Sequence, residues 1–410
     1  MALGVPKPAV ADQPGLTLAE ARAKARRVSP VLVAAREAIA SAAGRERQAG
    51  AFANPTLIYS HEETSQGGRK NSEHIALIEQ PLEIGGQRAA RRKAARLRRE
   101  ATEARLQEAE TQSDFDVARA FALALAADKR AEYAAQAADA FLAAQEISGK
   151  RLREGDVSGY ANRRLGLEAA RYLGLRAAAI SERRKARLTL SALLAAPGEA
   201  VSAIQTPLAD PFRIDRLDGS LENLRELALH RRAELRALKL EVEASMADAA
   251  LVSRSRIPTP IATAGFKTER PAGESGSFDG FVAGLRVPIP LWNRSAGAVA
   301  AAEAEARGRK AELHALRRRL IVEVEEAWAG LRTSAEQLDA LRPHLGSELE
   351  AGVTAARTAY AEGEILLVEW LDAVRAYNEA QSTFAVLKAD YLIQRATLER
   401  AVGSSVFGGP

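Results

Sequence analysis

The stretch EGEILLVEWLDAVRAY, residues 362–377, contains the features that decide the fold. Its glycine, Gly363, interrupts a sequence that otherwise has helical periodicity, and glycine is common where one helix stops. Two acids, Glu369 and Asp372, follow three residues apart beside an apolar stripe. A helix places residues with that spacing on one face. The stretch therefore predicts the turn of a helical hairpin, with two carboxylates on one face just beyond it.

A second turn of this kind occurs earlier in the chain. REGDVSG (153–159) has Gly155 where AEGEILL (361–367) has Gly363, at an offset of 208 residues. The acid after each glycine, Asp156 or Glu364, suits a helix N-terminus, where free N–H groups favour negative charge. Each half of the chain is therefore predicted to contain one helical hairpin tip.

The two halves also match elsewhere. LTLAEARAK… (16–55) and GSLENLREL… (219–258) each open on a leucine-rich helix start, run as an alanine-rich amphipathic helix and end at a proline. Such self-similarity is the sequence signature of a duplicated unit. We therefore predict two internal repeats with flanking segments, in this order: an N-terminal extension at 1–15, repeat 1 at 16–198, an inter-repeat equatorial segment at 199–218, repeat 2 at 219–403 and a C-terminal tail at 404–410.

Each repeat contains a predicted β-hairpin, at 56–80 and at 259–287. The connecting stretches SQGGRKN and ERPAGESG carry the residues that turns require. The last strand alternates, with Phe281, Ala283 and Leu285 on one face. Strands of about 9–11 residues cross a bilayer when tilted. The alternation fits a lipid-facing strand, and equally a small amphipathic sheet in a soluble protein.

After each hairpin the apolar period changes from 2 to 3.6. This predicts one long helix from about 86 to about 149 and a second from about 295 to 362, with Pro343 and Gly346 bending or interrupting the second. Aromatic residues make up 5% of the 410 residues and charged residues 27%, which favours long, laterally packed helices over a compact core. Helices of this length need packing partners.

Composition limits the other possibilities. The chain has no cysteine, so a disulfide or thiolate site is excluded. No stretch approaches about 18 consecutive apolar residues, so any part that crosses a bilayer is expected to consist of strands. The start, MALGVPKPAVADQPG, shows no secretory signal, as in a mature N-terminus given a new methionine or in a cytosolic protein.

The basic excess, a net charge of +5, is concentrated in one run. It contains Arg88, Arg91, Arg92, Lys93, Arg96, Arg98 and Arg99. Because the run has no interleaved aromatics and no recognisable binding motif, we expect no nucleic acid as a partner. A solvated helix face, or one near anionic headgroups, is the preferred interpretation.

The sequence shows no pattern for catalysis or for a cofactor. The five histidines form no ligand motif, and no triad, P-loop or dinucleotide fingerprint is present. His61 and His74 fall on the two strands of one predicted hairpin and can face each other, but surface positions are preferred to a metal site. Trp292, at a strand-to-helix junction, fits an interfacial aromatic or ordinary packing.

Three segments carry a resemblance to a known family: AYAEGEILLVEWLDAVRAYNEAQ (359–381), QPLEIGGQRAARRKA (80–94) and VPIPLWNRSAG (287–297). From about 16 to 403 the chain resembles the TolC family of outer-membrane efflux ducts, and the last two segments are most like its heavy-metal branch, the CzcC- and CusC-like ducts. The resemblance implies a mainly α fold with a small β part. It further implies a homotrimeric α/β-barrel duct with four transmembrane strands per protomer, in the outer membrane of a Gram-negative bacterium and extending into the periplasm.

The implied function is passive export through a tripartite RND-type system, with a periplasmic adaptor, an inner-membrane pump and outer-membrane lipid as partners. The implied cargo is heavy-metal cations, and no enzymatic activity is expected. A drug or organic-solute duct of the same family is the first alternative. A soluble coiled-coil scaffold is the second, although it leaves the two hairpins with bilayer-length strands unexplained.

The resemblance also assigns roles at the tips. Glu369 and Asp372 match acidic positions that line the periplasmic entrance, so a trimer would present a ring of six carboxylates and a weak candidate site for divalent metal. The residues expected to latch the entrance closed depart from the family pattern. Ile365 stands where the family has an arginine, and Ala161 stands where the family has the partner acid of that arginine. The residues expected at the gate and the adaptor-facing tips are Gly155, Asp156, Arg163, Arg164, Tyr360, Gly363, Glu364 and Ile365, with Tyr360 or the arginines paired to tip or ring acids.

Overall fold

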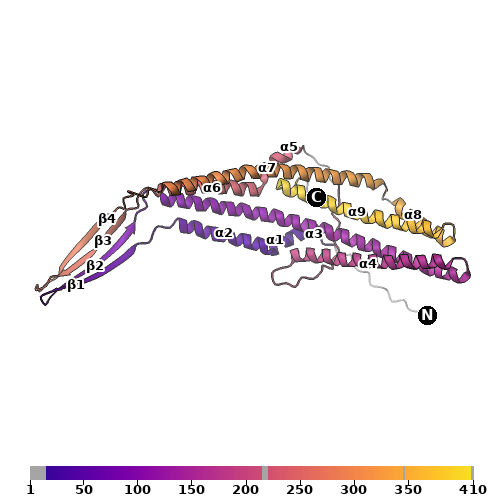
Figure 1. The fold of residues 1–410 in the computed structure, drawn as a ribbon, viewed down its shortest axis with the longest axis horizontal. Helices are drawn as coiled ribbons and strands as arrows, with labels where there is room; N and C mark the ends of the chain where they lie inside the picture. Colours follow the sequence, from indigo (N-terminus) through magenta and orange to yellow (C-terminus); the bar gives the residue numbers. More distant parts are fainter. Residues whose placement is uncertain (1–14, 215–219, 345–346, 408–410) are drawn as a thin grey trace. The chain divides into compact units, whose positions relative to one another are not determined.

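A computed structural model describes residues 15–214, 220–344 and 347–407. They form long helices and one small antiparallel sheet, as Figure 1 shows. By its contacts the chain divides into two compact units. The helical unit comprises Met1–Ala34, Gln107–Arg232 and Arg318–Pro410; the sheet unit comprises Ala35–Leu106 and Ala233–Arg317. Residues 1–14 of the expected N-terminal extension, 215–219 of the equatorial segment and 408–410 of the tail lie outside the described residues.

The sheet unit contains four strands in the order β1-β2-β3-β4. They are β1 Thr56–Gln66, β2 Arg69–Pro81, β3 Ile261–Arg270 and β4 Phe278–Arg286. Both predicted hairpins are therefore present. The first connection is shorter than predicted, because Gly67 and Gly68, with φ of 61° and 81°, close a two-residue turn and the strands extend up to it.

The two faces of the sheet differ in chemistry. One face exposes large apolar side chains: Leu57, Tyr59, Ile78, Phe266, Phe281 and Leu285. The strand register puts these residues on a common face with Ala283, since opposing residues share a face and alternate along each strand. The other face carries ion pairs, among them Lys267 with Glu73 at 3.0 Å. The predicted alternation of β4 thus extends across all four strands.

The basic run lies at the start of helix α3 (Gln87–Glu154) and is largely paired. Helix α2 (Pro30–Ala49) ends beside it, and the Nε atoms of Arg91 and Arg88 donate to the backbone oxygens of Ala49 and Gly50 at 2.9 and 2.6 Å. Three further partners are acidic: Arg91 pairs with Glu83, Arg98 with Asp248 of α6 (Ala233–Arg254), and Arg99 with Glu46. Arg92, Lys93, Arg96 and Arg98 are exposed, so this part of the run is a solvated helix face as predicted, whereas the half-buried Arg88 and Arg91 satisfy a helix end.

The helix that opens each repeat is broken in two, whereas the sequence predicted one. Helix α1 (Leu18–Val28) stops at Ser29 because Pro30 has no N–H to continue the ladder. Helix α5 (Leu221–Arg231) stops at Arg232, whose guanidinium donates to the backbone oxygen of Arg400 at 2.8 Å and pairs with Glu323 at 3.2 Å. The breaks occupy matching positions, 203 residues apart.

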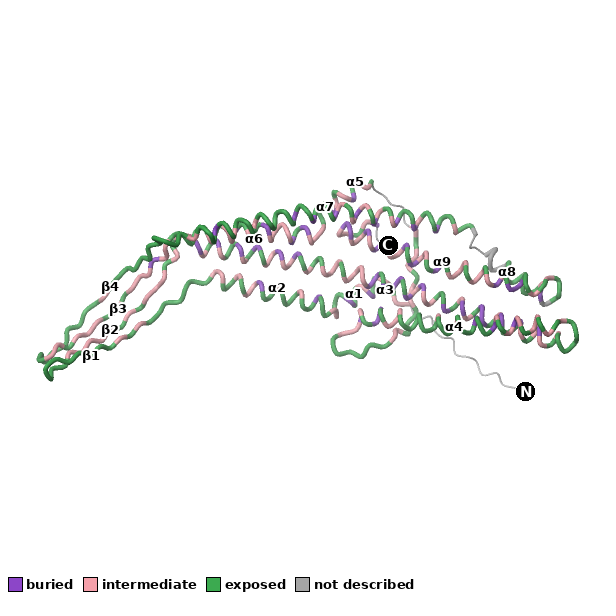
Figure 2. Tube along the Cα trace, viewed as in Figure 1, coloured by how far each residue is buried: buried purple, intermediate pink, exposed green. Residues whose placement is uncertain are grey.

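Alanines and leucines pack the leading helices of the helical unit against their neighbours. Ala21 and Ala25 of α1 are buried against Leu190 and Leu194 of α4 (Gly159–Leu194). Leu224 and Ala228 of α5 are likewise buried against the last turns of α9 (Leu367–Val402). The leading helix of each repeat thus packs on the end of the helix that follows the tip, and alanine allows the close approach. In Figure 2 buried residues recur between exposed ones along the helices.

The second long helix is interrupted near the position that the sequence predicts. Helix α7 spans Ala296–Leu341, a 3-10 turn η1 spans Arg342–His344, and α8 spans Ser347–Glu362. Pro343 lies inside the interruption, as predicted from its missing N–H, whereas Gly346 lies outside the described residues. No described helix has an apolar stretch long enough to cross a membrane.

Candidate functional site at the helical tips

The two tips share one backbone motif. Helix α3 ends at Glu154, Gly155 adopts φ of 87°, and the N–H of Asp156 donates to the oxygen of Arg151 at 2.9 Å. At the second tip Gly363 adopts φ of 84°, and the N–H of Glu364 donates to the oxygen of Ala359 at 2.8 Å. Both are Schellman turns, which need the left-handed conformation that glycine adopts without strain.

This geometry corrects the role expected of Asp156 and Glu364. Their backbone N–H groups close the preceding helices, and the next helices begin later, at Gly159 and Leu367. The N-cap residue of α4 is Ser158, whose Oγ accepts from the N–H of Ala161 at 3.2 Å. Neither acid is therefore an N-cap.

The second tip is capped differently. The residue before α9 is Leu366, which has no side-chain oxygen to accept a hydrogen bond. Glu369 compensates in part, because its Oε2 accepts from the N–H of Leu366 at 2.8 Å. A complete capping box has two reciprocal hydrogen bonds between the N-cap residue and the third helical residue. Here only one is formed, from the N-cap N–H to the acid at the third helical position. Glu369 thus has a structural role in addition to its charge.

Behind the tips lies an aromatic cluster, the tip cluster, formed by Phe141, Tyr172, Tyr360 and Trp370. Phe141 of α3 stacks on Tyr172 of α4 at 4.2 Å between ring centroids. Trp370 of α9 meets Phe141 edge-on at 5.3 Å and stacks on Tyr360 of α8 at 5.5 Å. All four side chains are buried, with Trp370 only 1% exposed. The cluster therefore joins the hairpin of the first repeat to that of the second.

Arg151, near the end of α3, contacts the end of α8 beside this cluster. Its Nη1 donates to the backbone oxygen of Tyr360 at 3.3 Å, and its guanidinium lies over the Tyr360 ring at 5.6 Å from the centroid. A cation at a helix C-terminus satisfies a free carbonyl and complements the helix dipole. Burial raises the pKa of the Tyr360 hydroxyl above its ordinary value, and the charge of Arg151 partly opposes that rise.

The predicted charged residues lie at the surface of the helical unit. Glu369 and Asp372 are both exposed, and Asp372 approaches Arg375 at 3.6 Å. Arg375 also pairs with Glu168 of α4. Among the described residues, Arg163 and Arg164 form no ion pair within the chain with Asp156, Glu364 or the two α9 acids. Tyr360, the third expected latch residue, is instead held by Trp370 and Arg151.

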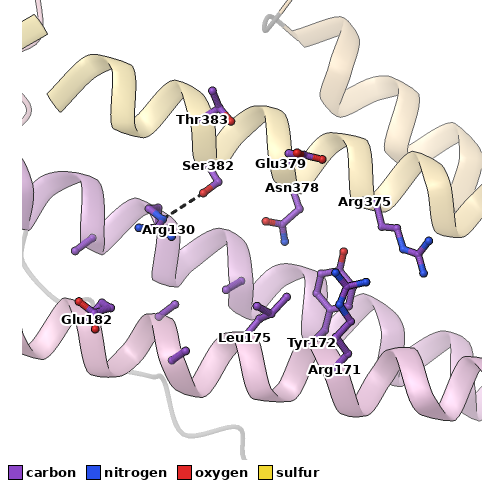
Figure 3. A pocket seen from close by; sticks show the side chains of 14 residues that line it. Arg130, Arg171, Tyr172, Leu175, Glu182, Arg375, Asn378, Glu379, Ser382 and Thr383 are labelled. Carbon is purple, nitrogen blue, oxygen red and sulfur yellow. Dashed lines mark hydrogen bonds between the residues drawn. The ribbon is translucent and has the colours of Figure 1, made fainter. Parts of the chain in front are cut away.

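A groove of about 450 Å³ is lined by α3, α4 and α9 (Figure 3). Three arginines line it, Arg130, Arg171 and Arg375, and the Nε of Arg130 donates to the Oγ of Ser382 at 3.3 Å. No sequence motif predicted this groove. Its arginines stand on alanine-rich helices with no distinctive motif, and they come from both repeats.

The sheet unit contains Trp292 and the pair His61 and His74, for which the sequence left alternatives open. Trp292 is 93% exposed, so the ordinary packing considered for it is wrong. His61 and His74 do face each other across β1 and β2. Among the residues that the structure describes, no group of three or more His, Cys, Asp or Glu side chains is arranged to hold a metal ion.

Comparisons with known proteins agree with this architecture. Residues 224–404 match the family described as outer membrane efflux protein. The cobalt-zinc-cadmium resistance protein CzcC of Cupriavidus metallidurans is 26% identical over 376 residues, covering 91% of this chain and 86% of that protein. The crystal structure of CusC is similar with a TM-score of 0.76 and 17% identity, covering 94% of this chain and 92% of CusC.

The CmeC outer membrane channel of Campylobacter jejuni is similar as well. Its TM-score is 0.78 at 13% identity, covering 95% of this chain and 86% of CmeC. At these identities the solved structures establish the fold, namely long helices with a small antiparallel sheet. The mainly helical fold predicted from the sequence is confirmed.

Proposed function

Because the chain belongs to the outer membrane efflux protein family, we propose that it is the outer-membrane channel of a tripartite RND-type efflux system, open from the periplasm to the exterior. The observation that carries this proposal is the sheet, whose one face exposes Phe266, Phe281 and Leu285 while the other carries ion pairs. Such a sheet suits lipid on one side and water on the other. The protein is then a passive duct and not an enzyme.

The sheet also supports assembly as a homotrimer. Its outer strands, β1 and β4, have free edges in the single chain. Lipid does not tolerate unpaired backbone groups, so β4 of one protomer is expected to pair with β1 of the next, closing twelve strands into a barrel. Trp292 extends from the junction beyond β4, beside the exposed Ile289 and Leu291, where an aromatic belt would meet the membrane interface.

The proposed cargo is heavy-metal cations. The relative CzcC is named for resistance to cobalt, zinc and cadmium. In this chain Glu369 and Asp372 are exposed on one side of α9, so three copies facing inward would place six carboxylates around the mouth. A ring of negative charge in a narrow aqueous opening concentrates cations and offers oxygen ligands to divalent ions.

The tips are the proposed contact with the periplasmic adaptor. Leu366 is exposed at the second tip, and Val157 is half-buried at the first. Short apolar side chains beside helix ends suit tip-to-tip contact with another helical hairpin. Ile365, expected at the gate and the tip, packs partly against the tip cluster.

We assign the closing of the mouth to the tip cluster and Arg151. In the described chain these residues join the second hairpin to the first, whereas the expected ion pairs of Arg163 and Arg164 are not formed. Any outward movement of α8 and α9 therefore has to separate Tyr360 and Trp370 from Arg151 and Phe141. The contact that keeps the mouth closed then consists of the aromatic tip cluster and the guanidinium of Arg151, and not of a surface ion pair.

The test is single-channel recording of the purified trimer in planar bilayers. The double variant Glu369→Gln, Asp372→Asn removes the two charges, and glutamine retains the capping acceptor. It is expected to lose cation selectivity and block by divalent ions. The matched control, Glu154→Gln with Asp156→Asn, removes two charges from the first tip and is expected to keep both properties. Unchanged selectivity in the first variant would reject the ring, and a chain that stays soluble on cell fractionation would reject the duct.

A further inference from the structure

A pair of histidines crosses the first hairpin of the sheet unit. His61 on β1 and His74 on β2 are register partners, so both side chains lie on the same face of the sheet. Their imidazole rings stack, with centroids 4.3 Å apart and planes inclined by 25°. From this geometry we propose that His61 and His74 form a two-histidine binding site for a divalent transition-metal ion such as Cu²⁺, Ni²⁺ or Zn²⁺.

The separation of the rings fits one shared ion. Metal–imidazole bonds of about 2.0–2.1 Å place the two ligand nitrogens roughly 3.3 Å apart in tetrahedral geometry. Because the rings stack with their planes inclined by 25°, their in-plane nitrogen lone pairs do not converge, and both side chains have to rotate out of the stack to share one ion. The strands themselves need not move, because eleven consecutive residue pairs hold the register of the hairpin.

Tyr59 supplies the hydrogen bond that metal-binding histidines usually have. Its hydroxyl lies 3.0 Å from Nδ1 of His74, and it stands two residues before His61 on the same face. When Nδ1–H donates to the hydroxyl oxygen, the Nε2 lone pair of His74 is free for a metal. The hydrogen bond also restricts the rotation of that ring.

The donor set determines the class of ion. Two imidazoles favour copper, nickel and zinc over magnesium and calcium, which require oxygen ligands. The site lies on the face that exposes Tyr59, and toward the turn the same face carries the pair of Glu63 with Lys70 at 2.6 Å. Because that acid is already paired, water is expected to complete the coordination.

The test is titration of the purified full-length protein in detergent with Cu²⁺ alone, with affinity from calorimetry and ligand count from electron paramagnetic resonance. Wild type is expected to bind one ion per chain at this site with two imidazole nitrogens. His61→Gln and His74→Gln should each weaken binding at least tenfold and leave one nitrogen. Tyr59→Phe, which removes only the hydroxyl, is expected to weaken binding about tenfold, the lower end of the effect of such partners.

His230→Gln is the matched control, because it removes a histidine from α5 and leaves the hairpin intact. It should keep the affinity and both nitrogens. Equal affinity and an unchanged two-nitrogen spectrum in His61→Gln and His74→Gln would overturn the proposal, provided that circular dichroism shows the sheet retained. Because binding is measured without transport, this outcome is independent of the proposed export role.

Discussion

The two helical tips have the same backbone and different surroundings. Both end a helix in a Schellman turn with glycine at φ near 85°, and the turns align at an offset of 208 residues. At that offset, however, Trp370 corresponds to Asn162, Glu369 to Ala161 and Asp372 to Arg164. The comparison shows that the glycine specifies where the helix turns, while the residues after it specify what the tip can do.

The contact between the tips is also one-sided. Arg151 reaches from the first hairpin to Tyr360 on the second, and the residue that aligns with Arg151 is Ala359, whose methyl group is too short and apolar to return the contact. The position aligned with Tyr360 is Leu152, which is exposed where Tyr360 is buried. At this contact the second hairpin is held by the first, whereas farther from the tips Arg375 of the second hairpin pairs with Glu168 of the first.

The largest expected effect comes from replacing each tip glycine, Gly155 or Gly363, by the β-branched residue valine. Gly363→Val and Gly155→Val both force a left-handed conformation on valine, at a cost of at least about 1–2 kcal/mol. Because the second tip is fastened through Tyr360, we expect Gly363→Val to abolish metal efflux from cells while the trimer still assembles. Gly155→Val is expected to reduce efflux less.

The control for this pair is Gly174→Ala in α4, where an added Cβ meets nothing within 4 Å. It should leave efflux unchanged. Trimer content is measured by crosslinking in every variant, so that loss of assembly is not mistaken for loss of transport. If Gly155→Val impairs efflux more than Gly363→Val, the assignment of the second tip as the held part is wrong.

Local signals were sufficient to predict much of this fold. The glycines predicted both tips, the turn residues and the alternation of the last strand predicted the two β-hairpins, and Pro343 predicted the break after α7. Pro30 also signalled the end of α1, although the sequence there was interpreted as one helix. At Arg232 no such signal exists, because the break is held by carbonyl oxygens from the far end of α9.

The candidate site was less predictable for the same reason. Its acids and glycines are local features, but the tip cluster joins Phe141 and Tyr172 to Tyr360 and Trp370 across about two hundred residues. Aromatic residues on alanine-rich helices show only that each helix has a buried face. Which face meets which depends on packing between repeats, and a single sequence does not contain that pairing.

A smaller effect is expected from removing the contact between the tips. Arg151→Ala eliminates the hydrogen bond to the oxygen of Tyr360 and the cation over its ring. Hydrogen bonds from charged groups contribute about 1.5–3 kcal/mol, and less where the arginine is partly exposed. We expect the mouth to open more often, seen as a higher open probability of single channels. Arg163→Ala is the matched control and should have no effect, whereas equal open probability in Arg151→Ala and wild type would remove Arg151 from the latch.

The smallest effect concerns the caps of the two helices that follow the tips. Ser158→Ala removes the Oγ acceptor at the start of α4 and is expected to cost about 1 kcal/mol. Leu366→Ser should do the opposite at α9, because it supplies the missing acceptor and, with Glu369, completes a capping box. The measurement is hydrogen exchange of the amides in the first turn of each helix. Exchange should become faster at Ala161 in the first variant and slower at Glu369 in the second. Unchanged exchange at Glu369 in Leu366→Ser would show that the glutamate alone already fixes this helix start, and that the two tips are equally well capped.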